Sequence, residues 1–317
     1  MRKGLVVLLM LVVVLLTAPA TGSAQPAGGT LVGARDLSAT RTEISVFSAA
    51  MNRVIRVQVL HPAGGGSRGS FYLLDGLFPG EDESTWTRAT DAEAFFLGKN
   101  VNVVLPLGGL ASYYTDWQHP DPVLGDYKWE TFLTRELPPV IDARFGGNGA
   151  NAIGGLSMGG GAAFTLASRN PWLYRAVAGY SACPDNSLGM GPMIGSIALR
   201  GANPFNMWGA PGDPDWAAHD PSVNADALRG KALYLWSATG IPGPHELEIK
   251  PQLPENIVTG GPVEAMVYAC VRAFEGRLGS LGIPARFAYQ PTGTHSWSYW
   301  RDALHDSWPT IGPAIGA

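Results

Sequence analysis

A serine between glycines is the first sign of chemistry in this chain. Residues Gly155–Gly159 read Gly-Leu-Ser-Met-Gly and match G-x-S-x-G, a pattern that holds a serine at a sharp turn from strand to helix. An apolar run at 150–153 precedes it, and a helix-forming stretch follows from Gly160. The glycines let the chain bend tightly and keep side chains away from the hydroxyl. We therefore expect Ser157 to be a nucleophile; the alternative is a glycine-rich turn that serves packing only.

This serine needs a base and an acid. A serine hydroxyl is a poor nucleophile until a base accepts its proton, and a carboxylate orients that base. In chains with this motif the order is serine, acid, histidine. His295 lies on a glycine-containing loop after the last expected strand and is favoured over His305, which falls inside a helix. The other histidines are His61, His119, His219 and His245. None is spaced from another potential ligand as metal ligands are, so we expect no metal site.

Position alone does not identify the acid. A carboxylate in the loop after the expected strand 232–236 would be Glu246 or Glu248, whereas Glu264 begins the next helix. All three lie between the serine and the late histidine, and spacing does not choose among them.

The elements that must position these residues alternate between strand and helix. Residues 43–60 alternate in polarity and break at Asn52-Arg53, as in an edge hairpin. Beyond them, apolar runs alternate with helix-forming stretches, which predicts an α/β fold with a mostly parallel sheet and helices on both faces. The expected strands are 71–74, 101–105, 150–153, 176–180, 232–236 and 286–289, and the expected helices are 92–97, 129–144, 157–168, 263–281 and 298–307.

Composition restricts the class of protein. The 317 residues are 46% hydrophobic and 15% charged with a net charge of -4, which excludes a disordered polar chain and a polycation built to hold nucleic acid. The 41 glycines and 25 prolines require many turns and exclude a coiled coil. No linker separates two cores, so we expect residues 25–317 to form one domain.

The first 24 residues have the pattern of a secretory signal peptide. Arg2 and Lys3 precede an apolar run over 5–16, and small residues follow up to Ala24, where we expect cleavage. A membrane anchor is the alternative, but this run is shorter than the roughly twenty residues that span a bilayer. Without the segment, which holds two basic and no acidic residues, the net charge of -4 becomes -6. We expect an exported, mildly acidic protein.

Longer motifs occur in order from about residue 70 to 300. Together with the serine motif, they make the chain resemble the antigen 85 mycolyltransferases of the mycolic-acid bacteria. The run Tyr-Lys-Trp-Glu-Thr-Phe-Leu is far more specific than the serine motif. The motifs are Leu73-Leu74-Asp75-Gly76-Leu77, Pro106-Leu107-Gly108-Gly109, Tyr114-Thr115-Asp116-Trp117, Tyr127-Lys128-Trp129-Glu130-Thr131-Phe132-Leu133, Gly189-Met190-Gly191-Pro192 and Thr294-His295-Ser296-Trp297.

The resemblance implies an α/β-hydrolase fold and the transfer of mycolyl chains between trehalose glycolipids in the cell envelope, with no cofactor. The family's nucleophile and histidine correspond to Ser157 and His295. Its acid, ten residues before a phenylalanine, corresponds to Glu264, with Glu246 as the alternative.

The resemblance also implies which groups surround the reaction. The backbone N–H groups of Leu77 and Met158 would hold the oxyanion. Asp75 and Trp297 would line the acceptor site, although Trp297 could equally be a core aromatic. A glycolipid donor and a sugar acceptor are the expected partners, with peripheral contact to an outer lipid layer and none to nucleic acid.

Two departures from the family pattern matter. Phe78 stands where many members have an arginine that helps to hold trehalose, and a phenyl ring offers stacking but no hydrogen-bond donor. The short family disulfide before Tyr127 is missing. Cys183 and Cys270 are the only cysteines, and in an exported protein such a pair often bridges; two buried thiols are the alternative. A bridge would tether the helix that carries Glu264.

Three functions are therefore expected, in this order. The first is a secreted mycolyltransferase. The second is a secreted serine carboxylesterase of the same fold, which the phenylalanine at position 78 favours. The third is a non-catalytic binding relative, against which the retained serine, glutamate and histidine argue.

Overall fold

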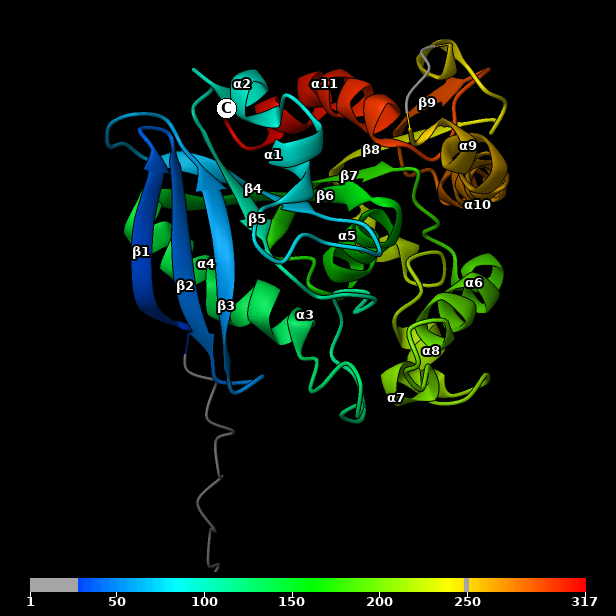
Figure 1. Cartoon of the computed structure of the whole chain (residues 1–317), viewed down its shortest axis with the longest axis horizontal. Coiled ribbons are helices and arrows are strands. Elements are labelled where there is room, and N and C mark those ends of the chain that lie inside the picture. The colour runs from blue at the N-terminus through cyan, green and yellow to red at the C-terminus, as the bar shows by residue number, and fades with distance from the viewer. Residues whose placement is uncertain (1–27, 248–250) are drawn as a thin grey trace, which may run out of the picture.

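The computed structural model describes residues 28–247 and 251–317, in which one mixed sheet of nine strands is flanked by helices (Figure 1). The expected signal peptide at 1–24 and Glu248 lie outside the described residues. The strand order is β1-β2-β3-β5-β4-β6-β7-β8-β9. The strands are β1 (Thr30–Ser38), β2 (Arg41–Ser48), β3 (Arg53–Leu60), β4 (Arg68–Leu74), β5 (Val101–Pro106), β6 (Gly147–Leu156), β7 (Tyr174–Tyr180), β8 (Ala232–Ala238) and β9 (Arg286–Gln290).

The sheet is antiparallel at one edge and parallel elsewhere. β1, β2 and β3 pair antiparallel, β3 pairs antiparallel with β5, and every later pairing is parallel. The expected hairpin at 43–60 is confirmed as β2 and β3, and the other expected strands are confirmed as β4 to β9. The parallel strands end at a common edge, where loops from several strands can meet.

Helices cover both faces, as expected. The structure has α1 (Thr85–Ala89), α2 (Ala92–Phe96), α3 (Trp129–Thr131), α4 (Leu137–Phe145), α5 (Ser157–Arg169), α6 (Asn186–Ala198), α7 (Phe205–Trp208), α8 (Pro214–Ala218), α9 (Leu253–Glu255), α10 (Gly261–Ser280) and α11 (Trp297–Ala314). Short 3-10 and π-helical turns are η1 (Phe132–Glu136), η2 (Ala225–Leu228), η3 (Pro244–Glu246) and η4 (Asn256–Gly260). None of the described helices is long and apolar enough to cross a membrane.

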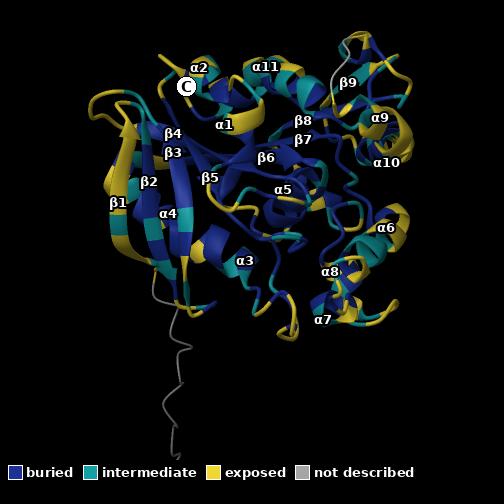
Figure 2. Cartoon of the chain, viewed as in Figure 1, coloured by how far each residue is buried: buried dark blue, intermediate teal, exposed yellow. Residues whose placement is uncertain are grey.

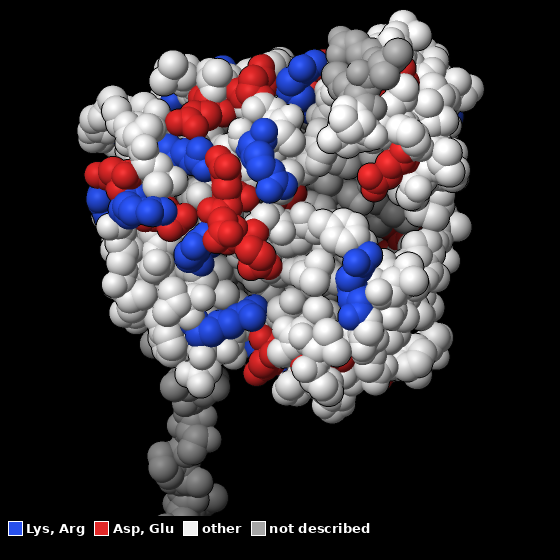
Figure 3. Space-filling view, in the orientation of Figure 1, with Lys and Arg blue, Asp and Glu red and all other residues white. Residues whose placement is uncertain are grey.

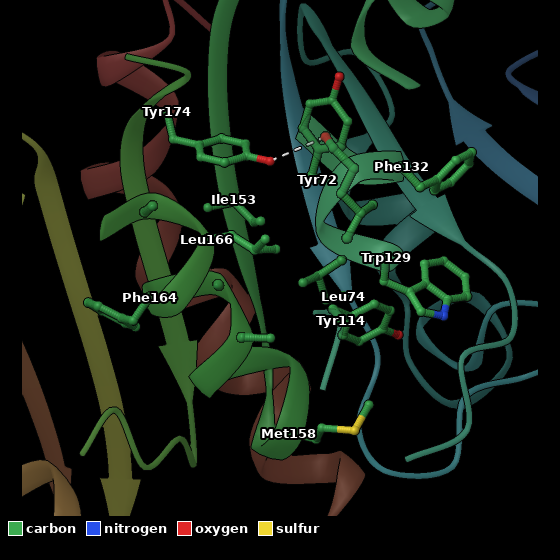
Figure 4. Packing of buried hydrophobic residues seen from close by; sticks show 14 of the residues in the cluster. Tyr72, Leu74, Tyr114, Trp129, Phe132, Ile153, Met158, Phe164, Leu166 and Tyr174 are labelled. Atoms are coloured by element: carbon green, nitrogen blue, oxygen red, sulfur yellow. Dashed lines mark hydrogen bonds between the residues drawn. The ribbon is translucent and has the colours of Figure 1, made fainter. Parts of the chain in front are cut away.

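Alternation along β4 shows how the two faces are filled. Tyr72 and Leu74 belong to a core cluster shared with α4, α5 and α10, while Phe71 and Leu73 belong to a second cluster shared with α2 and α11. Successive side chains of a strand point to opposite faces, so a fully buried strand needs apolar residues on both. Figure 2 shows the central strands as the most buried part of the chain, and Figure 4 shows the packing of the first cluster.

Three differences from the sequence prediction have physical reasons. The helix expected at 129–144 contains the π-helical turn η1, because Pro138 and Pro139 remove two backbone donors just after it. The helix expected to end at 307 continues to Ala314 through two prolines, since Ile311 is buried against the sheet. Strand β1 was not predicted, because it pairs with β2 through its backbone while its side chains stay largely exposed.

Candidate active site

Ser157 lies at the turn from β6 to α5, at the edge where the parallel strands end. Its φ is +51°, in the left-handed region that residues with a Cβ seldom adopt. Such strain persists only where the surrounding structure holds it, and it is typical of functional positions. The surrounding structure therefore holds the serine in a backbone conformation that is unfavourable for the isolated chain.

Two glycines make this turn sterically possible. A Cβ on Gly155 would lie 2.7 Å from the carbonyl carbon of Gly159, and a Cβ on Gly159 would lie 2.3 Å from the carbonyl oxygen of Asp75. Atoms cannot approach so closely, so both positions need glycine. The loop after β4 also comes close, because the Cβ position of Gly76 is 3.8 Å from the Cβ of Ser157.

The half-buried His295 and the buried Glu264 form a pair near this edge. The Nδ1 of His295 is 2.8 Å from Oε2 of Glu264. Glu264 is fully buried, and its Oε1 accepts hydrogen bonds from the Ser237 hydroxyl at 2.9 Å and the Ala238 N–H at 3.0 Å. With Nδ1 donating to the carboxylate, Nε2 of a neutral imidazole is free to accept a proton.

The surroundings of His295 restrict its ring. Its backbone N–H donates to the carbonyl of Gly260 at 3.1 Å. Its ring meets Trp300 edge to face at 4.9 Å, and the Trp300 indole N–H donates to the Ser181 hydroxyl at 2.9 Å. The imidazole is thus fixed by α11, by η4 and by the end of β7.

Glu246, the alternative acid, contacts the residue before His295 rather than its imidazole. Its Oε1 accepts from the Thr294 hydroxyl at 2.7 Å, and its Oε2 accepts from the Gly243 N–H at 2.8 Å and the Tyr299 hydroxyl at 2.5 Å. Burial and the bond to Glu246 raise the pKa of Tyr299. Of the two glutamates that the structure describes here, only Glu264 contacts the His295 ring; its catalytic role stays a prediction.

A strained loop holds the two expected oxyanion donors. Ala111 and Tyr113 have φ values of +50° and +52°. The Ala111 N–H donates to the Leu77 carbonyl at 3.2 Å, and the Tyr113 N–H lies 3.4 Å from Sδ of Met158. One loop therefore contacts both residues whose N–H groups are expected to face the reaction. The role of these N–H groups stays a prediction.

The expected substrate-binding residues differ in exposure. Asp75 is buried, and its carboxylate accepts from the Gly76 N–H at 3.0 Å and the Thr85 N–H at 3.2 Å. Burial raises the pKa of Asp75, and these hydrogen bonds oppose that rise. Trp297 is half-buried against Trp86, whereas the Phe78 side chain is 57% exposed. Contact of any of the three with substrate stays a prediction.

The bridge between Cys183 and Cys270 is present. It joins the segment after β7 to α10, the helix whose first turn carries Glu264. No group of three or more His, Cys, Asp or Glu side chains arranged to hold a metal occurs in the described part of the chain.

Sequence reasoning missed the groups that support the pair. Ser237 donates to Glu264, and the Gly260 carbonyl accepts from His295. A usable signal for Ser237 was present, because it directly follows the expected strand 232–236, at the edge where the parallel strands end. Arg200, whose guanidinium lies over the Phe78 ring, had no such signal.

Comparisons with known proteins agree with this geometry. Residues 48–311 match the family described as "Putative esterase". Diacylglycerol acyltransferase/mycolyltransferase Ag85B of Mycobacterium intracellulare is 34% identical over 286 residues, covering 86% of this chain and 83% of that protein. Ag85A of Mycobacterium leprae, with the same activity in its name, is 34% identical over 282 residues, covering 86% and 83%.

Solved structures share the fold. The crystal structure of Mycobacterium tuberculosis MPT51 matches with a TM-score of 0.72 and 29% identity over 84% of this chain and 96% of that one. The fluorophosphonate-binding serine hydrolase FphF of Staphylococcus aureus matches with a TM-score of 0.67 and 16% identity over 90% and 99%. At that identity the second match shows the fold alone. The expected α/β-hydrolase fold is confirmed.

Proposed function

This chain belongs to the putative esterase family and, within it, to the antigen 85 acyltransferases, and from that membership we propose that it is a serine acyltransferase for mycolyl chains. The observation that carries the proposal is the strained Ser157 turn at the same sheet edge as the hydrogen-bonded His295–Glu264 pair. Ser157 is the nucleophile, His295 the base and Glu264 the acid that orients it.

The first half of the cycle forms an acyl-serine. The Ser157 oxygen attacks the carbonyl carbon of the donor ester while Nε2 of His295 accepts the serine proton. The N–H groups of Leu77 and Met158 hold the oxyanion, and one such donor is typically worth about 3 kcal/mol of transition-state stabilisation. The bond to the donor alcohol then breaks, and the imidazolium returns its proton to the departing oxygen.

The second half repeats these steps with a new alcohol. An acceptor hydroxyl gives its proton to His295 as its oxygen attacks the acyl-serine, and the serine leaves with that proton. Only proton transfers, additions to the carbonyl carbon and the expulsion of an alcohol from each tetrahedral intermediate occur, so the cycle itself requires no cofactor. Trehalose mycolates are the proposed donors, and trehalose or a cell-wall sugar is the acceptor.

The setting we propose is the cell envelope. Residues 1–24 are a signal peptide and 25–317 one exported domain with no nucleic-acid partner. The Cys183–Cys270 bridge supports an oxidising compartment. Apolar side chains close to the site, on segments after α6 and β8 and in η4, are exposed and suit peripheral contact with lipid: Leu199, Ile241 and Val258 are 80%, 58% and 74% exposed.

A secreted carboxylesterase is the second candidate. The ring of Phe78 offers an acceptor sugar no donor, and water could then resolve the acyl-serine. The two activities share the first half of the cycle and differ in the second half, where an acceptor alcohol forms a new ester and water releases the free acid.

Two assays test the proposal. A fluorophosphonate probe is expected to label the wild type and to leave Ser157→Ala and heat-denatured protein unlabelled; an unlabelled wild type contradicts a catalytic serine. Purified protein given trehalose monomycolate with and without excess trehalose is expected to form trehalose dimycolate. Release of free mycolic acid alone contradicts the transferase and supports the esterase.

A further inference from the structure

Arg200 presents a guanidinium without a carboxylate partner beside the candidate site. Its guanidinium carbon lies 4.3 Å from the centre of the Phe78 ring. Its Nε is buried and has no hydrogen-bond partner in the described part of the chain. No ion pair among the described residues includes it. Of the five N–H donors of a guanidinium, the four on the two Nη atoms, and not the buried Nε–H, are the ones that a ligand could meet.

Phe78 places this pair close to the nucleophile. It lies two residues after Gly76, whose Cβ position is 3.8 Å from the Cβ of Ser157. Two residues of extended chain span at most about 7 Å. The Phe78 backbone is therefore within about 7 Å of Gly76, on the loop that passes beside the serine turn.

The segment that carries Arg200 is tied to the same turn. Near the end of α6, the Ser196 hydroxyl is 2.7 Å from the Tyr113 hydroxyl, and the Tyr113 N–H lies 3.4 Å from Sδ of Met158. The Arg200 N–H donates to the Ile197 carbonyl at 2.9 Å, which closes a tight turn after the helix. Arg200 is thus positioned by contacts that lead back to the residue after the serine.

The chemistry of the pair selects its ligand. A guanidinium donates parallel hydrogen bonds to neighbouring oxygens, and a phenyl ring packs against C–H groups. An alcohol with many hydroxyls uses both, whereas a bare phosphate or carboxylate uses only the charge. In Figure 3 most of the charged side chains on this face gather on the side of β1 to β3, and fewer lie on the side of α6 and α10.

The geometry points to Arg200 as a specificity-determining residue which, together with Phe78, forms the subsite for the sugar that accepts the acyl group. This inference rests on the proposed transferase function. Phe78 supplies the apolar platform, and Arg200 supplies the hydrogen-bond donors that a phenyl ring lacks. The pair binds the acceptor and takes no part in forming the acyl-serine.

Transfer from p-nitrophenyl butyrate to trehalose tests the inference, because this donor carries no sugar. Release of p-nitrophenol without trehalose reports acylation of Ser157, and mass spectrometry of butyryl-trehalose reports transfer. Arg200→Ala is expected to raise the trehalose concentration for half-maximal transfer about tenfold, while the acylation rate changes less than about threefold. Arg200→Lys is expected to need a trehalose concentration between those of the wild type and Arg200→Ala.

Phe78→Ala and a matched control complete the test. Phe78→Ala is also expected to raise the trehalose concentration for half-maximal transfer. In the double variant the free-energy cost of trehalose binding is expected to be smaller than the sum of the two single costs, since the residues act as a pair. Arg135, whose guanidinium lies 4.7 Å from the ring of Trp172 on another element, is the control, and Arg135→Ala is expected to behave as wild type.

The outcomes separate this inference from the proposed function. An unchanged trehalose requirement in Arg200→Ala overturns it, as does an equal fall in acylation, which indicates a structural role. A wild type that cleaves the ester but forms no butyryl-trehalose overturns the transferase function, and the acceptor subsite with it.

Discussion

Glu264 is fully buried and yet has three hydrogen-bonded neighbours: the His295 ring, the Ser237 hydroxyl and the Ala238 N–H. An ionised carboxylate out of water is stable only when its lone pairs are satisfied in this way. Both Glu264 and Glu246 have their carboxylate oxygens hydrogen-bonded. At the scale of the residue, they differ in their partners, because only Glu264 contacts the imidazole of His295.

The two glutamates are expected to respond differently to the loss of charge. Glu264→Gln lowers kcat by about 10³- to 10⁴-fold, because an amide favours the wrong tautomer of His295. Glu246→Gln lowers it only about tenfold, because it loosens the loop through Thr294 and leaves the imidazole partner in place. Steady-state kinetics on both variants, with melting temperatures as the folding control, check this. A larger loss in Glu246→Gln than in Glu264→Gln would reverse the assignment.

A second prediction concerns the effect on stability of adding a Cβ to the glycines of the serine turn. Gly159→Ala destabilises the protein by about 3 kcal/mol or more, because the new Cβ would lie 2.3 Å from the Asp75 carbonyl oxygen. Gly161→Ala, in the same helix, meets only the Cys183 carbonyl oxygen at 3.4 Å and is expected to be neutral or to stabilise by up to about 1 kcal/mol. Urea denaturation measures both; similar losses in the two variants would mean that helix propensity, and not close approach, decides.

At the scale of the element, the bridge between α10 and the segment after β7 holds the acid-bearing helix. It closes a loop of 87 residues, for which chain entropy predicts about 4–5 kcal/mol of stabilisation. We expect dithiothreitol to lower the urea midpoint of the wild type, and the double variant Cys183→Ala/Cys270→Ala to have the low midpoint with or without reductant. If reduction of the disulfide, verified by alkylation of the two thiols that form, leaves the midpoint unchanged, the bridge does not constrain this helix.

Glu130 joins α3 to the end of α5. It accepts from Arg169 Nε at 2.9 Å and Asn170 Nδ2 at 3.0 Å, and Nε2 of His219 is 3.7 Å away. Burial acts to raise the pKa of Glu130, but these three partners outweigh it, and the pKa lies below its usual value.

This shift has a definite sign in the pH dependence of stability. A lowered folded pKa adds stability above the unfolded value of about 4.3, and that stability is lost as the pH falls through the folded pKa. We expect Glu130→Gln to be less stable than wild type by about 1–3 kcal/mol at pH 7, with the difference shrinking below about pH 4. Thermal melts between pH 3 and 7 measure it; a difference that grows toward low pH would contradict the sign.

At the scale of the whole molecule, the sheet edge that carries Ser157 lies close to several exposed apolar side chains. Leu199 precedes Arg200, Val258 lies in η4 beside the Gly260 carbonyl that holds His295, and Ile241 accepts from the Gly293 N–H at 2.6 Å. This arrangement suits a donor that is drawn from a lipid layer directly into the site.

Replacing these side chains is expected to separate lipid contact from chemistry. The triple variant Leu199→Ser/Ile241→Ser/Val258→Ser loses tenfold or more of its binding to sedimented vesicles of envelope lipid, because each apolar side chain is worth about 1.5–3 kcal/mol when fully buried. Three serines at Val32, Val54 and Val123, which are 55%, 49% and 59% exposed elsewhere, are the matched control. Equal binding by both triple variants would contradict a lipid-facing edge.

Much of this architecture was predictable from local patterns. The strands β2 to β9 and the helices α5 and α10 follow from apolar periodicity and turn residues, because those features act within a few residues of the chain. Strand β1 was not, since its exposed side chains leave no apolar pattern. The hydrogen-bond partners of Glu246 and Glu264 were also not predictable from local patterns. Both carboxylates follow β8 in the chain, and only packing decides which one contacts His295.

The sequence by itself determined the serine turn between strand and helix, the late histidine and the layered α/β class, since each depends on neighbouring residues and on strand and helix periods. Only the tertiary structure decided that Glu264 meets His295 across 31 residues, that Cys183 meets Cys270 across 87, and that the guanidinium of Arg200 lies over Phe78. The physical reason is that such contacts join segments distant in the chain, and their distances depend on how every intervening element packs.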